Sequence, residues 1–368
     1  MKKVGGSFWA SSGVIVLAVL AMAALVPAAT VAYRISAGRV PAMWVAVMRS
    51  REIMDNAGVR GYYERLMGKY GRMDKIYLYD NSFRIFRLMP NLTWQRDLIT
   101  TNSFGLVGPE RTLEKPPHTR RIALIGASLD AGQLVPEKQI YGQLLEDRLN
   151  ADRPNGPGER FEVLNFSCIS YTLPQIVDTA IEDAPRFDPD VYLIDVNELA
   201  ASTEWSRHMV QITQQHIDPK YGFLREILQK AGVSATDSTD ILYGKLAPYR
   251  IPIVQGFLQT LEDNIASRHA SLIVMLVPAV EAGELSKQRV DTVREVIRGL
   301  HVPVVDLLDS FREYLYPAQL AAYPGDIHPN RRGHALIFQN LYTKLHAQPE
   351  AWRALVGQGP SRAPAPPQ

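Results

Sequence analysis

The stretch that decides the fold is Arg121-Ile122-Ala123-Leu124-Ile125-Gly126-Ala127-Ser128-Leu129-Asp130-Ala131-Gly132-Gln133-Leu134-Val135. Its run Ile122–Ile125 is continuously apolar, as expected of a parallel strand that is covered on both faces. A serine just after the carboxyl end of such a strand lies where open α/β sheets bind ligands. A helix that begins there would direct backbone N–H groups and its positive end toward developing negative charge. Ser128 is therefore a candidate nucleophile, and the alternative is that it is only a helix N-cap.

Outward from this stretch, apolar runs alternate with helical stretches. The predicted strands are Ile122–Ile125, Phe161–Phe166, Val191–Val196, Leu272–Val277 and Val302–Leu307. Helices are predicted between them, for example over Tyr141–Leu149 and Lys287–Leu300. This alternation predicts an α/β fold, a three-layer α/β/α sandwich around a parallel five-stranded sheet. Residues 199–270 contain helices but no strand, so we expect an insertion that packs over the site as a lid.

Two later segments could complete a site with Ser128. In Asp326-Ile327-His328 the two polar side chains are two residues apart on an extended loop, so they point the same way. The carboxylate can then fix the imidazole through Nδ1 and leave Nε2 to take a proton from a serine. Asn197 ends the third predicted strand, where its amide can donate to an oxyanion. The alternatives are a packing histidine and an asparagine that only forms a turn.

Together, these segments resemble the SGNH/GDSL hydrolase superfamily over residues 100–345. The blocks that carry the resemblance are Arg121–Val135, Val163–Tyr171 followed by Gln175, Asp188–Glu198, and Asp326–His334. The upstream segment Asn102–Glu110 resembles the lead-in of bacterial membrane-anchored members, some of which are associated with polysaccharide acylation. The order and the spacing of the blocks agree with the family, so the joint match is more specific than any single block.

Several positions depart from the family pattern. Ala127 replaces the aspartate of Gly-Asp-Ser, and Ser170 and Asp195 stand where the second and third blocks have glycine. Glu198 replaces the aspartate after Asn197, and the acid lies two residues before His328, where many members have three. Serine keeps a backbone N–H at position 170, but a positive φ there would be unfavourable for it.

The resemblance implies roles for particular residues. Ser128, Asp326 and His328 would be catalytic, and the N–H groups of Ser128 and Ser170 with the Asn197 amide would form the oxyanion hole. No spacing typical of metal ligands is present, and the resemblance implies neither a metal nor a cofactor.

The implied function is a serine esterase or deacylase that acts through an acyl-enzyme on an acylated small molecule or glycan, with O-acetyl as the expected group. One alternative is an O-acyltransferase for an extracytoplasmic polysaccharide. Another is a non-catalytic carbohydrate-binding or assembly protein, which the departures at Ala127, Ser170 and Asp195 suggest. The third is an ordinary doubly wound domain, in which Ser128 and His328 would lie too far apart for a hydrogen bond.

The N-terminus predicts a membrane anchor. No charged residue lies between Lys3 and Arg34, and residues 14–32 are almost wholly apolar. About 20 such residues can cross a bilayer, and signal-peptide cores are usually shorter. We therefore expect an uncleaved signal anchor, with a signal peptide cut near residues 27–30 as the alternative. Basic residues flank both ends of the span, so charge does not decide its orientation. The resemblance implies an extracytoplasmic catalytic domain on a single-pass membrane protein.

Composition limits the remaining possibilities. The 40 basic and 38 acidic residues nearly balance and are scattered, which gives no reason to propose nucleic acid as a partner. Cys168 is the only cysteine, so an intramolecular disulfide is excluded.

We expect four parts: a cytoplasmic tip and transmembrane anchor (1–34), a membrane-proximal helix and lead-in (35–118), the hydrolase-like domain (119–350) and a disordered Pro-rich tail (351–368).

Overall fold

The structure is a computed structural model that describes residues 76–94, 99–156, 158–197, 199, 204–280, 284–314, 317–322 and 326–357. The predicted membrane span and the helix predicted to follow it, up to residue 75, lie outside the described residues. Within the described part, no helix has both the length and the apolar composition that crossing a bilayer requires.

A parallel sheet forms the centre of the molecule, and the predicted strands appear in it within three residues of their expected bounds. In spatial order, its five strands within the described residues are β6 (Arg160–Asn165), β5 (Thr119–Ile125), β7 (Val191–Asp195), β8 (Ser271–Leu276) and β9 (Val304–Asp306). Ile122 of β5 is in register with Val163 on one side and with Val191 on the other. The order along the sheet reverses between β5 and β7, and such a switch point leaves a crevice beyond the carboxyl ends of the strands.

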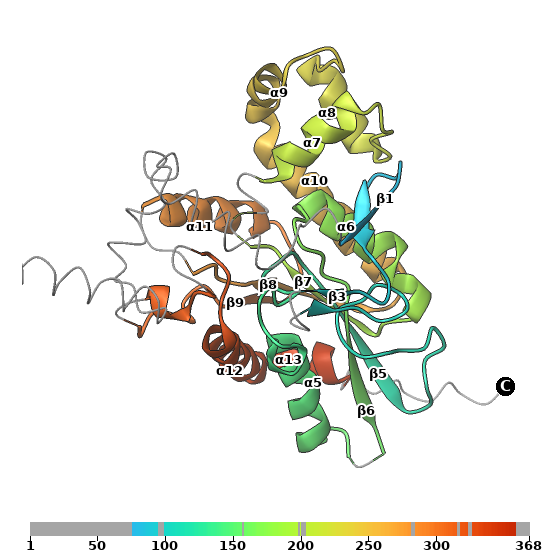
Figure 1. Cartoon of the computed structure of the whole chain (residues 1–368), viewed down its shortest axis with the longest axis vertical. Helices are drawn as coiled ribbons and strands as arrows, with labels where there is room; N and C mark the ends of the chain where they lie inside the picture. Colours follow the sequence, from blue (N-terminus) through green and yellow to red (C-terminus); the bar gives the residue numbers. More distant parts are fainter. Residues whose placement is uncertain are drawn as a thin grey trace, which may run out of the picture.

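Helices cover both faces of this sheet (Figure 1). On one face lie α5 (Tyr141–Asp152), α12 (Arg331–Ala347) and α13 (Pro349–Val356), and on the other lie α6 (Leu173–Glu182), α10 (Arg250–Ser267) and α11 (Glu284–Ile297). Successive residues of a strand point to opposite faces. Accordingly, Ile122 and Leu124 pack with α5 and α12, whereas Ala123 and Ile125 pack with α6 and α10. The predicted three-layer sandwich is therefore confirmed.

The region predicted as a 199–270 insertion divides into two parts. Helices α7 (Trp205–Gln214), α8 (Gly222–Ala231) and α9 (Thr239–Leu246) form a cluster beyond one end of α6 (Figure 1). The long helix α10, by contrast, buries Val254, Phe257 and Leu261 in the core of the sandwich. It is the crossover helix between β7 and β8, so the prediction was wrong to place it in the insertion.

The lead-in segment is docked onto the sandwich. It forms two short hairpins, β1 (Tyr77–Tyr79) with β2 (Phe86–Leu88) and β3 (Thr93–Trp94) with β4 (Ile99–Thr100). Arg84, between β1 and β2, pairs with Asp178 of α6 and with Asp183, the residue that caps the end of this helix. The first hairpin is thereby fixed to the helix that follows the second strand of the main sheet.

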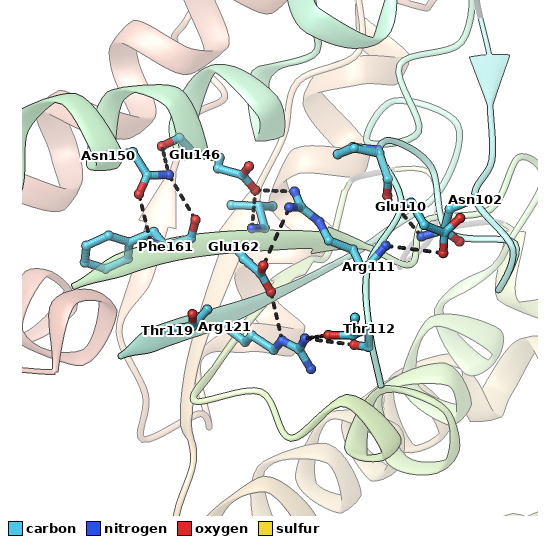
Figure 2. A network of polar contacts seen from close by, with 12 residues as sticks. Asn102, Glu110, Arg111, Thr112, Thr119, Arg121, Glu146, Asn150, Phe161 and Glu162 are labelled. Atoms are coloured by element: carbon cyan, nitrogen blue, oxygen red, sulfur yellow. Dashed lines mark hydrogen bonds and ion pairs between the residues drawn. The ribbon is translucent and has the colours of Figure 1, made fainter. Parts of the chain in front are cut away.

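A buried ionic network joins the end of the lead-in to the sheet (Figure 2). Arg111 Nη2 lies 2.6 Å from Glu146 Oε2 of α5, and Arg121 Nε of β5 lies 3.0 Å from Glu162 Oε2 of β6. The Arg121 guanidinium also donates to the carbonyl oxygens of Thr112, Leu113, Glu114 and Phe187. The carbonyls of Thr112, Leu113 and Glu114 lie in a segment without regular structure, and Phe187 ends a short 3-10 helix, Ala184–Phe187. Arg121 therefore gives hydrogen-bond partners to backbone groups that would be costly to bury without one.

The fold continues past the predicted start of the tail. Helix α13 occupies Pro349–Val356, and Arg120 of β5 donates to the carbonyl oxygens of Ala354 and Leu355 at its last turn. Proline is favoured in the first turn of a helix, where an N–H would have no intrahelical partner. The boundary at residue 351 was therefore wrong, and residues 358–368 of the predicted tail lie outside the described residues.

Candidate active site

Ser128 lies in a tight turn directly after β5. The Asp130 carboxylate folds back under this turn and accepts a hydrogen bond from Ala127 N, at 2.8 Å from Oδ2. A Cβ added at Gly126 would lie 1.9 Å from the same oxygen, so glycine is required there. The chain continues from Ser128 in successive turns, and the next regular helix is α5. The helix expected to begin at Ser128 is therefore absent from the described residues, and isolated turns take its place.

His328 connects the serine to an acid. Its Nε2 lies 2.8 Å from Ser128 Oγ, and its Nδ1 lies 2.7 Å from Asp326 Oδ1. The carboxylate accepts from Nδ1–H, which leaves Nε2 as the acceptor for the serine hydroxyl. Asp326 is 6 % exposed, and His328 is partly buried. The doubly wound alternative predicted Ser128 and His328 too far apart for this bond, and the 2.8 Å distance contradicts it.

Backbone bonds hold the loop that carries His328. Ala322 N donates to His328 O at 2.8 Å, and Val280 N donates to Ile327 O at 2.7 Å. Immediately after the loop, the Asn330 side chain accepts from the N–H groups of Arg332 and Gly333 and caps α12. The imidazole is therefore positioned by bonded structure on both sides.

Ser170 and Asn197 line the same cavity as Ser128. That cavity has a volume of about 270 Å³. Its lining is Ala127, Ser128, Leu129, Gln133, Ile169, Ser170, Tyr171, Asn197, Leu199, Glu204, Arg207, Ile327 and His328. Ser170 has a φ of 68°, in the left-handed region that favours glycine. Ser170 thus adopts, with a Cβ, a backbone conformation that glycine adopts more easily.

Two bonds orient the Asn197 side chain. Its Nδ2 donates to Asp195 Oδ2 at 2.9 Å, and its Oδ1 accepts from Leu199 N at 3.0 Å. The direction of this amide is thus set by Asp195 and by the Leu199 N–H.

Asp195 forms a buried pair with Asp130, which sequence reasoning missed. The two carboxyl groups interact electrostatically with each other, and both side chains are fully buried. Burial raises the pKa of both, and the neighbouring Asp130 charge raises the pKa of Asp195 further. Asp130 also accepts from the Tyr141 hydroxyl and from Ala127 N, which favours its charged form. The proton of the pair therefore lies on Asp195.

The pair connects the proposed nucleophile to the proposed oxyanion donor. Asp130 holds the turn before Ser128, Asp195 holds the Asn197 amide, and Val277 N donates to Asp195 Oδ1 at 2.9 Å. Asp130 lies two residues after Ser128, so its presence beside the turn could have been noticed. Its pairing with Asp195, 65 positions later, depends on β5 and β7 being neighbours in the sheet, and the local sequence does not predict this.

Helix α7 supplies two charged groups to the cavity that the sequence did not single out. Arg207 Nη2 donates to Ser170 O at 2.8 Å, and Glu204 lies 4.0 Å from the same guanidinium. Burial raises the pKa of the Glu204 carboxyl, which the Arg207 charge opposes. The helical cluster therefore does contribute to the cavity wall, as expected of a segment that packs over the site.

Three residues of the quoted blocks are structural. His334 is fully buried and stacks on Tyr141, and burial lowers its pKa to about 3, so it stays neutral. Cys168 is buried, and burial raises the pKa of its thiol, which disfavours the reactive thiolate. The Gln175 side chain completes a capping box with Thr172 at the start of α6. Among the described residues, no group of His, Cys, Asp and Glu has the arrangement of a metal site.

No family model and no curated protein matches the chain. Solved structures that are similar to it include TesA, at 13% identity over 62% of this chain and 99% of that one, with a TM-score of 0.41. Another is the acetylxylan esterase Axe2 of Geobacillus stearothermophilus, at 17% identity over 61% and 94%, with a TM-score of 0.40. A third is a two-domain esterase active on acetylated mannans, at 15% identity over 67% and 53%, with a TM-score of 0.42. These likenesses are distant, and the roles of the site residues rest on this chain's own geometry.

Proposed function

We propose that this chain is a serine esterase or deacylase of the SGNH/GDSL type, which removes ester-linked O-acetyl groups from a glycan. The observation that carries the proposal is the unbroken line of hydrogen bonds from Asp326 through His328 to Ser128, with lengths of 2.7 and 2.8 Å. A base within this reach of a hydroxyl, itself oriented by a third group, is the arrangement that activates a serine for nucleophilic attack.

The first half of the reaction would form an acyl-enzyme. Ser128 Oγ attacks the ester carbonyl carbon while its proton passes to His328 Nε2. The tetrahedral intermediate then collapses, the bond to the sugar oxygen breaks, and His328 returns the proton to the leaving alcohol. Asp326 orients the imidazole and stabilises its charged form throughout.

In the second half, water attacks the acyl carbon and gives its proton to His328 Nε2. The bond to Ser128 Oγ breaks, the proton returns to the serine, and the carboxylic acid leaves. In both halves, the N–H groups of Ser128 and Ser170 and the Asn197 amide would donate to the oxyanion. Loss of one such donor typically raises the barrier by about 3–4 kcal/mol.

The size of the cavity supports a short acyl group. Its volume of about 270 Å³ is below the range of about 300–1,000 Å³ that is typical of sites for drug-sized ligands. Leu129, Ile169 and Ile327 contribute apolar surface, whereas Ser128, Asn197 and His328 contribute the polar groups. An acetyl group is therefore small enough to lie within this cavity, whereas a long acyl chain would have to extend toward the adjoining cavity that Ser170 and Arg207 also line.

Hydrolysis of p-nitrophenyl acetate tests the proposal. We expect turnover by the full chain, weaker turnover of p-nitrophenyl octanoate, and a loss of about 10³-fold or more in Ser128→Ala and in His328→Ala. Each variant should retain the wild-type circular dichroism spectrum. Equal rates for wild type and Ser128→Ala would exclude Ser128 as the nucleophile and favour the non-catalytic binding protein.

The same acyl-enzyme would support O-acyl transfer if a sugar hydroxyl replaced water as the acceptor. The observation that favours this alternative is a second, larger cavity next to the catalytic one. Incubation of the enzyme with an acetyl donor and an oligosaccharide, followed by mass spectrometry, separates the two outcomes. Free acetate alone would indicate hydrolysis, whereas an oligosaccharide heavier by one acetyl group would indicate transfer.

The proposed place of action is the extracytoplasmic side of the cell membrane, where surface glycans are found. It depends on the apolar N-terminal segment at residues 14–32, which predicts a single-pass anchor. Fractionation of cells that express the full chain, with protease treatment of intact spheroplasts, tests this placement. We expect the catalytic domain in the membrane fraction and degraded by protease added outside.

A further inference from the structure

A second cavity opens next to the catalytic one, between the β1–β2 hairpin and helix α7. Its volume is about 440 Å³. Ser170 and Arg207 line both cavities, so the two adjoin at the loop that carries Ser170. We call this second cavity the hairpin groove. We propose that the hairpin groove binds a neutral oligosaccharide chain, whose acylated sugar unit reaches Ser128.

The floor of the groove is aromatic. Tyr77 and Tyr79 lie on the same face of β1, and Phe86 pairs with Tyr79 across the hairpin. The ring centroids of Tyr77 and Phe86 are 4.6 Å apart, and those of Tyr79 and Phe86 are 5.9 Å apart. Tyr77 and Phe86 are buried, whereas Tyr79 is 63% exposed. Exposed aromatic surface that continues a buried cluster offers an apolar face with a polar edge, which suits the C–H face of a sugar ring.

The opposite wall is polar and follows one side of α7. Arg207, Gln211 and Gln215 line the groove at intervals of four residues, and Glu204 lines the catalytic cavity three residues earlier. Such spacing places side chains on one face of a helix. At 1.5 Å per residue, this polar row extends for about 16 Å, from the catalytic cavity into the groove. A substrate that follows it would be a chain and not a single small ester.

The chemistry of the lining fits neutral hydroxyl groups. Asn81, Gln211 and Gln215 offer amides that both donate and accept, so they can bind the neighbouring hydroxyls of a sugar. The charged groups of the lining, Asp80 and Arg207, have opposite signs. The groove therefore has no excess charge with which to select a polyanion.

Residues that line the groove also hydrogen-bond to the loop that carries Ser170, whose backbone N–H is a proposed oxyanion donor. Tyr77 Oη donates to Ile169 O at 3.0 Å and lies 3.3 Å from Ser170 Oγ, while Arg207 Nη2 donates to Ser170 O at 2.8 Å. The hairpin and α7 thus hold the Ser170 loop between them. An oligosaccharide bound to both walls would contact the elements that set the position of the Ser170 N–H.

Direct binding tests the groove independently of catalysis. The full chain carrying Ser128→Ala is titrated by calorimetry with unacylated pentasaccharides of β-1,4-linked xylose, mannose, glucose or N-acetylglucosamine. We expect at least one to bind, and we expect Tyr79→Ala and Gln211→Ala each to weaken that binding about tenfold or more. Tyr243→Ala removes another exposed tyrosine, from α9 outside the groove, and should bind as the parent does.

The link to the reaction rests on the proposed esterase and has its own readout. With the pentasaccharide that binds, carrying acetyl esters, Tyr79→Ala should raise KM about tenfold and change kcat much less. The groove proposal would be overturned if no pentasaccharide bound or if Tyr79→Ala bound as its parent does. It would also be overturned if oligogalacturonate, a polyanionic chain, bound more strongly than the neutral pentasaccharides. Turnover of p-nitrophenyl acetate would still support the esterase in those cases. Conversely, oligosaccharide binding that depends on Tyr79, without any ester turnover, would support the groove and contradict the esterase.

Discussion

At the scale of single residues, Ser170 has a backbone conformation that glycine adopts more easily. A left-handed conformation costs a residue with a Cβ about 1–2 kcal/mol, and Ser170 has a φ of 68°. We expect Ser170→Gly to retain esterase activity, because the proposed donor is the backbone N–H.

The matched variant for this prediction is Ser170→Ala, which keeps the Cβ and loses the hydroxyl near Tyr77. Urea unfolding should find Ser170→Gly more stable than Ser170→Ala by about 1 kcal/mol. If the two variants were equally stable, the left-handed backbone at this position would not be a source of strain.

A second residue-scale prediction concerns Asp195 and pH. Burial and the Asp130 charge raise the pKa of Asp195 well above its usual 3.8, so the folded chain binds this proton more tightly than the unfolded chain. The resulting stability is fully present below pH 3.8 and is lost as pH rises toward the folded-state pKa. Asparagine has no proton to lose, so we expect Asp195→Asn to remove this part of the pH dependence.

Urea unfolding of wild type and Asp195→Asn between pH 4 and pH 8 provides the measurement. The difference in unfolding free energy should move in favour of the variant as pH rises, by at most about 1.4 kcal/mol per pH unit. A difference that stays constant over this range would mean that Asp195 has an ordinary pKa.

At the scale of elements, the ionic network between the lead-in, β5 and β6 should be a main determinant of stability. Arg121 is fully buried, and Glu162 is 5% exposed. Removing one partner of a buried ion pair leaves an uncompensated charge, which typically costs about 3–5 kcal/mol. We expect Glu162→Gln to destabilise the chain by about this amount in chemical denaturation.

The control is an exposed pair of the helical cluster, Arg225 with Asp218, whose closest approach is 3.2 Å. Solvent screens such pairs, so Asp218→Asn should change stability far less than Glu162→Gln. Comparable effects of the two substitutions would show that the network of Figure 2 is no more important than a surface contact.

The strands of the sheet could be predicted from sequence because each is short, apolar and covered on both faces. Two elements were misassigned for physical reasons. Helix α13 begins at Pro349, and proline is favoured in the first turn of a helix. The proline-rich composition beyond the helix nevertheless suggested a disordered tail. Helix α10 was placed in the insertion because its role as a crossover depends on its packing against α6 and β8, which its own sequence does not specify.

At the scale of the whole molecule, the candidate site is built at the switch point of the sheet. Ser128 follows β5, Asn197 follows β7, and His328 arrives from a loop beyond β9. The sequence could identify these residues because each lies at a strand end or beside a second polar residue. It could not identify the hairpin groove, because Tyr79 and Gln211 come from elements that only the tertiary fold brings together.

The central claim is that Ser128 is an activated nucleophile, and labelling with a fluorophosphonate tests it most directly. The full chain is treated with the probe and digested, and the modified residue is identified by mass spectrometry. We predict a single phosphonylated serine at position 128, with labelling abolished in Ser128→Ala and greatly slowed in His328→Ala. Unlabelled Ser128 in a correctly folded sample, or labelling at the same rate without His328, would contradict the account.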